Sequence, residues 1–311
     1  MAISRPIAFR IFGPENEFDM AFPSGFEHIT REQEQLAPFT WFRIGGAAQF
    51  WVEPTSIEEL AAVVRAAAAE GLMIRVLGGG SNLLVRDEGV SGVVLHLTAA
   101  AFAKIEVNKK RIIAGGGAKL GHVVSTAVRE GLAGLEQLVG IPGTLGGALR
   151  SNAGTHGGDI GQWTTSATVM TRSGEILTRS KDELRFGYRA SSLDELVILE
   201  ATLDLEMASS AMLTKQMQQT WILKKAQLPS ADQATSCIFK NPGGVSAASL
   251  IEEAGMHSAR VGNAEVSDRN AAYIVAQPGC TSREVIELIE LIRKTVADRT
   301  GVDLETAIEI W

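Results

Sequence analysis

Short apolar runs alternate with one amphipathic stretch in the first hundred residues. Three of the runs predict strands, at residues 49–54, 73–77 and 92–97. Between the first two, Ser56 and Glu59 form the S-x-x-E pattern that opens a helix, and Gly71 is a typical helix stop. This strand–helix–strand order indicates a small α/β unit. The first 35 residues carry little periodic signal, and we interpret them as an extension.

The pattern starts again after residue 98 with a second α+β unit. A hairpin is predicted around Asn108, followed by a helix over 118–130 that Gly131 ends. Alternating residues over 166–180, with a Ser-Gly turn, predict a second hairpin, and 195–206 is a strong β run.

A third unit begins near residue 207. A helix over 211–225 places Leu213, Met217 and Trp221 on one stripe. Helix 247–255 and a β segment at 271–276 follow. Thr281 and Glu284 form a capping box that opens a long helix, and Gly301 ends it. The predicted buried face of this helix consists of Val285, Leu288, Ile289, Ile292 and Val296. Residues 304–311 are a predicted terminal strand. We therefore expect three domains: residues 1–97 with 303–311, residues 98–206, and residues 207–302.

Composition narrows the functional classes. The net charge of −7 and the pI near 5.4 argue against nucleic acid or an acidic membrane as the main partner. Two cysteines, Cys237 and Cys280, cannot form a disulfide framework and match no zinc spacing. No stretch resembles a signal peptide or a membrane span. We expect a cytoplasmic monomer without a metal. Cys280 precedes a helix start whose dipole could lower its pKa, but we expect no function for it.

Two glycine-rich segments are candidate cofactor loops. Gly78-Gly79-Gly80-Ser81-Asn82 follows a strand, and its amides could converge on a pyrophosphate. Residues 140–148 (GIPGTLGGA) and 151–154 (SNAG) form the second segment, where the backbone could approach a flat ligand closely. The first segment is neither a G-x-G-x-x-G nor a P-loop motif. Tight turns and close packing remain the alternative for both.

Two further motifs carry polar chemistry. In residues 186–191 (FGYRAS), Arg189 could clamp a carboxylate, although a surface ion pair is the ordinary reading of a lone arginine. In residues 236–242 (SCIFKNP), Lys240 and Asn241 could bind phosphate or carboxylate oxygens. On a strand Cys237, Phe239 and Asn241 would share one face, while a lone cysteine is usually a buried apolar residue.

Taken in this order, the four motifs resemble the UDP-N-acetylenolpyruvoylglucosamine reductase (UDP-N-acetylmuramate dehydrogenase) family, in its shorter type. The resemblance extends from about residue 36 to the end and includes residues 39–46 (FTWFRIGG), 264–267 (AEVS) and the final G-V-x-L-E. It implies an α+β fold with two FAD-binding domains of the vanillyl-alcohol oxidase type and a third, substrate-binding domain. It also implies non-covalent FAD, NADPH as hydride donor, and reduction of UDP-N-acetylglucosamine enolpyruvate to UDP-N-acetylmuramate for peptidoglycan.

Site residues follow by position from the resemblance. Arg189 matches the arginine that stabilises the enolate-like intermediate, and Cys237 stands where the family has a proton-donating serine. A thiol with a pKa of about 8.5 donates a proton more readily than an alcohol. The expected cofactor contacts are Arg43, Gly78, Gly79, Gly80, Ser81, Asn82, Gly140, Pro142, Gly143, Thr144, Gly146, Gly147, Asn152, Ala153 and Gly154. The other expected substrate contacts are Tyr188, Ser191, Lys224, Gln227, Lys240 and Asn241.

Three positions depart from the family pattern. Ala307 stands where the family carries a catalytic glutamate, Asn270 replaces a histidine, and Ala276 replaces an asparagine. Glu305 and Glu309 would share a strand face with Ala307, each displaced by roughly 6 to 7 Å, and a solvent contact or salt bridge is the ordinary reading of both. These losses leave two alternatives open: a same-fold FAD oxidoreductase with another substrate, or a flavin-binding protein with little turnover.

Overall fold

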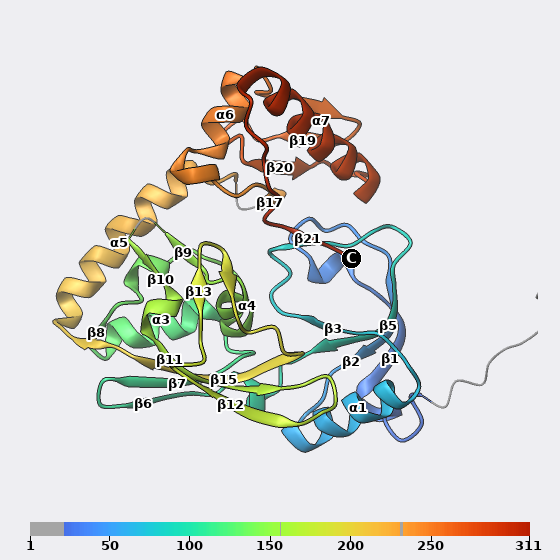
Figure 1. Cartoon of the computed structure of the whole chain (residues 1–311), viewed down its shortest axis with the longest axis vertical. Helices are drawn as coiled ribbons and strands as arrows, with labels where there is room; N and C mark the ends of the chain where they lie inside the picture. Colours follow the sequence, from blue (N-terminus) through green and yellow to red (C-terminus); the bar gives the residue numbers. More distant parts are fainter. Residues whose placement is uncertain (1–21, 156, 231–232) are drawn as a thin grey trace, which may run out of the picture.

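The computed structural model describes residues 22–155, 157–230 and 233–311. Its three largest β-sheets fall one in each of the three ranges that the sequence pattern separates. Figure 1 places the third sheet and its helices above the other two, with the long helix α5 (Ser210–Gln227) running along one side to join the second unit to the third. The division into domains at residues 97 and 206 stays a prediction.

The first unit contains a four-stranded mixed sheet in the order β1-β2-β5-β3. The edge strand β1 runs antiparallel to β2, whereas β2, β5 and β3 are parallel, so α1 makes the crossover from β2 to β3. The elements are β1 (Thr30–Gln35), β2 (Ala47–Val52), α1 (Ile57–Ala69), β3 (Ile74–Leu77), β4 (Leu83–Leu84) and β5 (Val90–His96), with short 3-10 helices at Glu27–Ile29 and Ala37–Phe39.

The second unit is built on a five-stranded antiparallel sheet in the order β12-β11-β15-β7-β6. Helices α3 and α4 supply apolar residues to the same core as this sheet. The elements are α2 (Ala100–Ala103), β6 (Ile105–Asn108), β7 (Arg111–Gly115), α3 (Leu120–Arg129), β8 (Leu132–Ala133), a 3-10 helix at Glu136–Leu138, α4 (Leu145–Arg150), β9 (Gly154–Thr155), β10 (Gly158–Asp159), a 3-10 helix at Ile160–Trp163, β11 (Thr164–Met170), β12 (Ile176–Ser180), β13 (Phe186–Gly187), β14 (Ala190–Ser191), β15 (Val197–Asp204) and β16 (Glu206–Met207).

The third unit packs two helices on a four-stranded antiparallel sheet in the order β17-β20-β19-β18. Val285, Leu288 and Ile292 of α7 lie in its core, on the helix face that the sequence predicted. The elements are β17 (Ala234–Cys237), a 3-10 helix at Pro242–Gly244, α6 (Ala247–Glu253), β18 (Arg260–Val261), β19 (Ala264–Val266), β20 (Tyr273–Ala276), α7 (Ser282–Thr300) and β21 (Glu309–Ile310).

The C-terminal segment links the third unit to the first. The backbone of Glu305 and Ala307 is hydrogen-bonded to Lys240 and Ile238, at the end of β17. Strand β21 then pairs in parallel with β4, and the Asn82 side chain donates to Ala307 O at 2.9 Å. Segment 304–311 therefore holds the sheet of the third unit against the first glycine-rich loop.

A second link joins the first unit to the start of α7. The Asp87 carboxylate accepts hydrogen bonds from the backbone N and the hydroxyl of Ser282, at 3.0 and 2.8 Å. The Asp87 backbone N donates to the same hydroxyl at 3.0 Å. An acidic side chain at this position also interacts favourably with the helix dipole.

Predictions based on local signals are confirmed. Thr281 and Glu284 form the reciprocal capping box at the start of α7, and Gly301 ends the helix with φ +73°. Ser56 caps α1 by accepting from the backbone N of Glu59, although the Glu59 carboxylate reaches the Thr55 amide instead of closing the box on Ser56.

Three predictions are wrong. Residues 30–35 are not part of an extension but form β1, whose polar residues suit an exposed edge strand. Trp221 is 40% exposed rather than buried on the stripe of α5, which buries only Leu213 fully. The terminal strand is limited to Glu309–Ile310, because residues 304–308 pair only through an isolated bridge between Phe239 and Thr306. Residues 1–21 lie outside the described residues.

Candidate active site

The two glycine-rich loops lie against each other. A Cβ on Gly79 would come within 2.6 Å of the Gly143 Cα, and one on Gly78 within 2.8 Å of the Thr144 hydroxyl. Real Cβ atoms do not approach other atoms this closely, so both positions require glycine. Ser81 Oγ donates a long hydrogen bond to Pro142 O at 3.5 Å. Close packing thus accounts for part of the glycine content, as the alternative reading expected.

The same loops retain backbone groups for a ligand. Within the described chain, the amides of Gly79, Gly80, Ser81 and Asn82 donate no hydrogen bond. Gly80 has φ +64°, in the left-handed region that glycine adopts without strain. Consecutive free amides form an anion-binding concavity. These loops therefore fit the pyrophosphate of a dinucleotide such as FAD, with the first loop supplying the donors.

Several predicted cofactor residues have packing contacts of their own. A Cβ on Gly140 would collide with the Trp221 ring, and Gly154 approaches Asp159 as closely. Gly146 N donates to Gly116 O, and Gly147 N donates to the Thr144 hydroxyl that caps α4. The Asn152 side chain is hydrogen-bonded to the backbone of Gly187 and Gly161, and the next residue, Ala153, is buried. Arg43 is exposed, with φ +53°. Their contacts with a cofactor stay predictions.

Cys237 lies beside the first loop, and the charge of Arg189 acts on it from the hairpin of the second unit. Ser236, next to Cys237 on β17, donates its hydroxyl to Ser81 O at 2.8 Å. Burial raises the pKa of the Cys237 thiol, and the nearby Arg189 guanidinium opposes part of that rise. Desolvation disfavours the thiolate. The thiol is therefore in the protonated form that a proton donor needs at neutral pH.

Tyr273 is a neighbour of this pair that the sequence pattern did not single out. It lies directly opposite Cys237 in the β17–β20 register. Burial and the adjacent thiol raise the pKa of its phenol, so it stays protonated. Its only sequence signal was an aromatic residue in a β run, which is ordinary for a core strand.

The β13–β14 hairpin of the second unit contacts the third unit close to Cys237. Arg189 sits at the tip of the β13–β14 hairpin with Tyr188, whose ring lies 5.9 Å from the guanidinium carbon. The Tyr188 hydroxyl accepts a hydrogen bond from the Asn241 backbone N at 3.0 Å. Asn241 Oδ1 accepts from Ala247 N at 3.0 Å, which holds the loop before α6. The hairpin of the second unit thus touches the third.

Other predicted substrate residues lie elsewhere or have partners. Lys224 Nζ donates to Gln137 O and Val139 O at 2.7 and 2.8 Å, and burial lowers its pKa to about 8. Gln227 is exposed at the end of α5. Ser191 Oγ donates to Arg150 O at 2.9 Å. Substrate contacts of all three stay predictions.

Neither Glu305 nor Glu309 takes the place of the missing family glutamate. Ala307 follows the bridge at Thr306, and Glu305 instead forms an ion pair with Lys240 at 3.1 Å. The Glu305 side chain is 75% exposed, and Glu309 is exposed in β21. Both match the salt-bridge and solvent reading rather than a substituted catalytic group.

Comparison with known proteins identifies the family. The model for the UDP-N-acetylenolpyruvoylglucosamine reductase C-terminal domain matches residues 228–311, and a model for an FAD-binding domain matches 48–180. The reductase of Rhodopirellula baltica is 37% identical over 298 residues, covering 96% of this chain and 98% of that protein. The chain belongs to the UDP-N-acetylenolpyruvoylglucosamine reductase family. Reductase 2 of Symbiobacterium thermophilum is 40% identical, covering 90% of this chain and 92% of its own.

The reductase family also accounts for the fold. The crystal structure of the Thermus caldophilus enzyme matches with a TM-score of 0.78 and 33% identity, covering 91% of this chain and 99% of that one. The fold is thus the FAD-binding α+β type with the C-terminal domain of the reductases, as predicted. Within the described residues, no helix has the length and apolar character to cross a bilayer, and no cluster of acidic, histidine and cysteine side chains could hold a metal.

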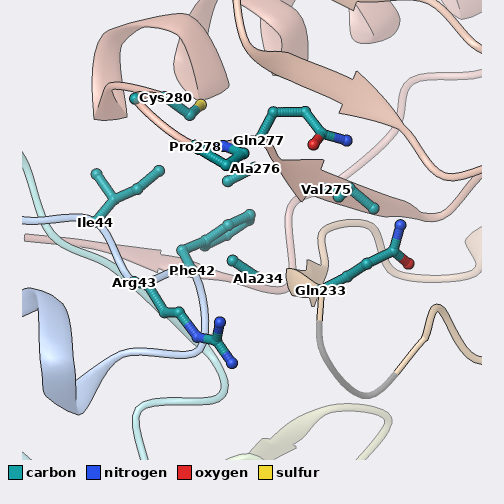
Figure 2. A pocket seen from close by; sticks show the side chains of 11 residues that line it. Phe42, Arg43, Ile44, Gln233, Ala234, Val275, Ala276, Gln277, Pro278 and Cys280 are labelled. Atoms are coloured by element: carbon teal, nitrogen blue, oxygen red, sulfur yellow. The ribbon is translucent and has the colours of Figure 1, made fainter.

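A cavity of about 330 Å³ lies where this reductase chain joins its first and third units. Figure 2 shows Phe42 and Ile44 on one side, facing Ala276, Pro278 and Cys280 on the other. Burial, followed by the charges of Glu284 and Asp87, raises the pKa of Cys280 to about 12. This effect opposes the helix-dipole effect considered for this cysteine, and it favours the neutral thiol over the thiolate at neutral pH.

Proposed function

We propose that this protein reduces UDP-N-acetylglucosamine enolpyruvate to UDP-N-acetylmuramate, with NADPH as electron donor and FAD as bound cofactor. Membership of the reductase family over more than nine-tenths of the chain supports the substrate. The observation that carries the chemistry is the position of Cys237 beside a loop of free amides and within the electrostatic influence of Arg189.

The residues have complementary tasks in this proposal. FAD, when bound, supplies hydride transfer between NADPH and the substrate. Arg189 stabilises the negative charge that develops on the enolpyruvyl carboxylate, an effect typically worth a few kcal/mol for one donor. Cys237 Sγ then gives its proton to C2 of the enolpyruvyl group. A raised thiol pKa helps here, because a thiolate has no proton to give.

The binding surfaces are proposed from the same geometry. Amides of residues 79–82, with the 142–144 loop against them, hold the FAD pyrophosphate. Tyr188, Lys240 and Asn241 line the approach from the third unit and bind the UDP-linked part of the substrate. This arrangement supports the division at residues 97 and 206, with FAD between the first two domains and the substrate held by the third.

An anaerobic two-step experiment tests the function. NADPH should bleach the yellow protein, and UDP-N-acetylglucosamine enolpyruvate added afterwards should restore the colour while UDP-N-acetylmuramate appears. A colourless protein would exclude FAD. Bleaching without recovery would instead favour a different substrate for the same fold.

We further propose that the enzyme works in the cytoplasm as a monomer. Both cysteines are free, which suits a reducing compartment, and the proposed substrates are nucleotides. Light scattering of the FAD-loaded protein should give the mass of one chain, 33.1 kDa plus cofactor. A mass of two chains would contradict the monomer.

A further inference from the structure

The hairpin that carries Arg189 has an unusual backbone at its tip. Strands β13 and β14 pair Phe186 with Ser191 and Gly187 with Ala190, so Tyr188 and Arg189 form a two-residue turn. Arg189 has φ +54°. Glycine and asparagine favour this left-handed region, whereas an arginine there is strained. A hairpin with only two paired residues in each strand needs outside contacts to hold such a conformation.

Those contacts come from the last residue of α4 and the residues directly after the helix. Asn152 Nδ2 donates to Gly187 O at 2.8 Å, one residue before the turn. On the other strand, Ser191 Oγ donates to Arg150 O at 2.9 Å. The hairpin is therefore fastened on both strands to residues 150–152, which directly continue the helix that starts in the glycine-rich loop at Thr144.

Asn152 is itself fixed in place. The residue is 4% exposed, and its Oδ1 accepts a hydrogen bond from Gly161 N at 3.0 Å. Its φ of +44° lies in the left-handed region that asparagine tolerates better than most residues. The position thus calls for a side chain that donates, accepts and permits this backbone, and asparagine does all three.

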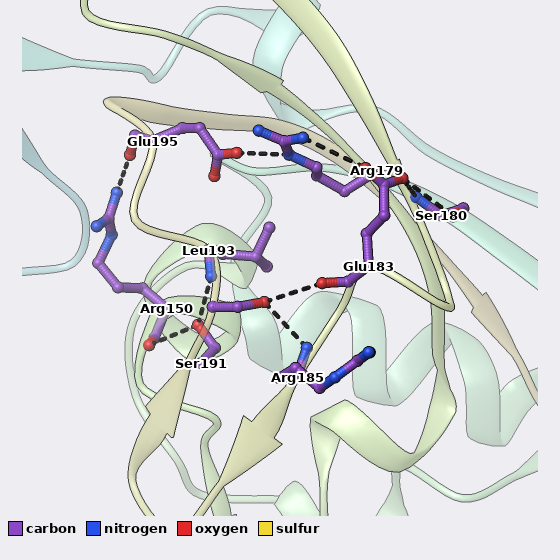
Figure 3. A network of polar contacts seen from close by, with 9 residues as sticks. Arg150, Arg179, Ser180, Glu183, Arg185, Ser191, Leu193 and Glu195 are labelled. Atoms are coloured by element: carbon purple, nitrogen blue, oxygen red, sulfur yellow. Dashed lines mark hydrogen bonds and ion pairs between the residues drawn. The ribbon is translucent and has the colours of Figure 1, made fainter.

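The attachment point on the other strand is also rigid. Figure 3 shows Arg150 reaching Glu195, whose carbonyl accepts from the guanidinium, while Ser191 Oγ accepts from Leu193 N at 3.3 Å. The Glu195 carboxylate in turn accepts from Arg179 at 2.7 Å. Because both anchors are held by further bonds, a change at Asn152 would move the hairpin rather than residues 150–152.

We propose that Asn152 is a positioning residue, whose amide fixes the Arg189 hairpin at a set distance from the cofactor loop. This inference rests on the proposed function, because it assigns the benefit to substrate reduction. Asn152 acts through the hairpin backbone and not on the substrate. Its loss should therefore slow the half-reaction that uses Arg189 and spare the one that does not.

Asn152→Asp is the sharpest variant. The carboxylate keeps the acceptor for Gly161 N but removes the donor to Gly187 O. Asn152→Gly serves as the second variant, because it removes the side chain and still permits the positive φ. The matched control is Thr165→Val, which deletes another side-chain donor to a backbone carbonyl in the same unit, to Thr202 O at 3.2 Å, where neither residue is bonded to the hairpin or to residues 150–152.

Flavin reoxidation by UDP-N-acetylglucosamine enolpyruvate should slow roughly 10- to 100-fold in both Asn152 variants, the range expected when a catalytic group is misplaced by about 1 Å. With each enzyme saturated with FAD, flavin reduction by NADPH should be unaffected in the Asn152 variants, and both half-reactions should be unaffected in the Thr165→Val enzyme. In an Arg189→Ala background, Asn152→Asp should cause no further slowing, because the group it positions is already gone.

Two results would overturn the proposal. One is an Asn152→Asp enzyme with wild-type reoxidation. The other is additive slowing in the Arg189→Ala background, which indicates a general structural role. Amide exchange of residues 186–191 gives a readout that needs no substrate: it should accelerate in Asn152→Asp and not in Thr165→Val. If UDP-N-acetylglucosamine enolpyruvate does not reoxidise the wild-type protein, the proposed function fails. The positioning role of Asn152 is then judged separately, and unchanged amide exchange in Asn152→Asp would reject it.

Discussion

Replacing Gly79 with alanine would separate the two glycine-rich loops. The new Cβ would lie 2.6 Å from the Gly143 Cα, where carbon atoms normally stay 3.5 to 4.0 Å apart. The loops must therefore move apart by about 1 Å. Overpacking of this kind typically costs about 1 to 3 kcal/mol. For a protein of this size, we expect the melting temperature to fall by roughly 2 to 5 °C.

The same movement should weaken FAD binding. The shift displaces the free amides of residues 79–82, and losing one hydrogen bond to a charged phosphate costs about 1.5 to 3 kcal/mol. This corresponds to a roughly 10- to 150-fold higher Kd for FAD. Fluorescence titration of the apoprotein with FAD measures the affinity, and calorimetry measures the melting temperature.

A matched variant separates this effect from glycine replacement in general. Gly121 is exposed in α3 and has nothing within 4 Å of an added Cβ. Gly121→Ala should therefore stabilise the protein by about 0.5 to 1 kcal/mol and leave FAD binding unchanged. A Gly79→Ala protein that melts lower but binds FAD normally would refute the cofactor role of the loop. Normal melting would refute the packing argument.

Three other variants test separate contacts. Cys237→Ala should slow flavin reoxidation by substrate roughly 10²- to 10⁴-fold and leave reduction by NADPH intact, whereas equal loss of both steps would contradict proton donation. Since burial raises the pKa of this thiol, wild-type reoxidation should not fall between pH 6 and about 8. Tyr273→Phe should slow stopped-flow reoxidation about 2- to 10-fold, the worth of one hydrogen bond, and an unchanged rate would exclude the phenol. Asp87→Ala should lower the free energy of unfolding in urea by about 1 to 2 kcal/mol, because it removes the hydrogen bonds to Ser282. The neighbouring change Glu88→Ala should lower it little, and equal effects would argue against the contribution of the Asp87–Ser282 contact.

Local signals in the sequence were the reliable ones. The capping box at Thr281, the stop at Gly301 and the apolar face of α7 were predicted because a helix end and a helix face are encoded by neighbouring residues. The polar edge strand β1 was missed because its residues show no alternation of apolar and polar side chains. Only its pairing with β2, a contact between separate segments, makes it a strand.

The site was predicted less completely than the fold, because its contacts join distant segments. Cys237 and Arg189 were found through family motifs, but the sequence pattern gives no reason to place Tyr273 opposite Cys237. Trp221 looked like a core residue of α5, yet it packs against Gly140 at the edge of the second unit. The salt-bridge reading of Glu305 was correct, since it pairs with Lys240, but the sequence could not name this partner, which lies 65 residues away.

The pairing of β4 with β21 has a consequence for biosynthesis. Asn82 and Ala307, which are hydrogen-bonded, are 225 residues apart in the chain. At about 5 to 20 residues per second, the ribosome needs roughly 10 to 45 seconds to make the second partner after the first. During that interval the nascent first unit lacks a neighbour for β4, so we expect the newborn chain to acquire flavin late, after translation has passed residue 310.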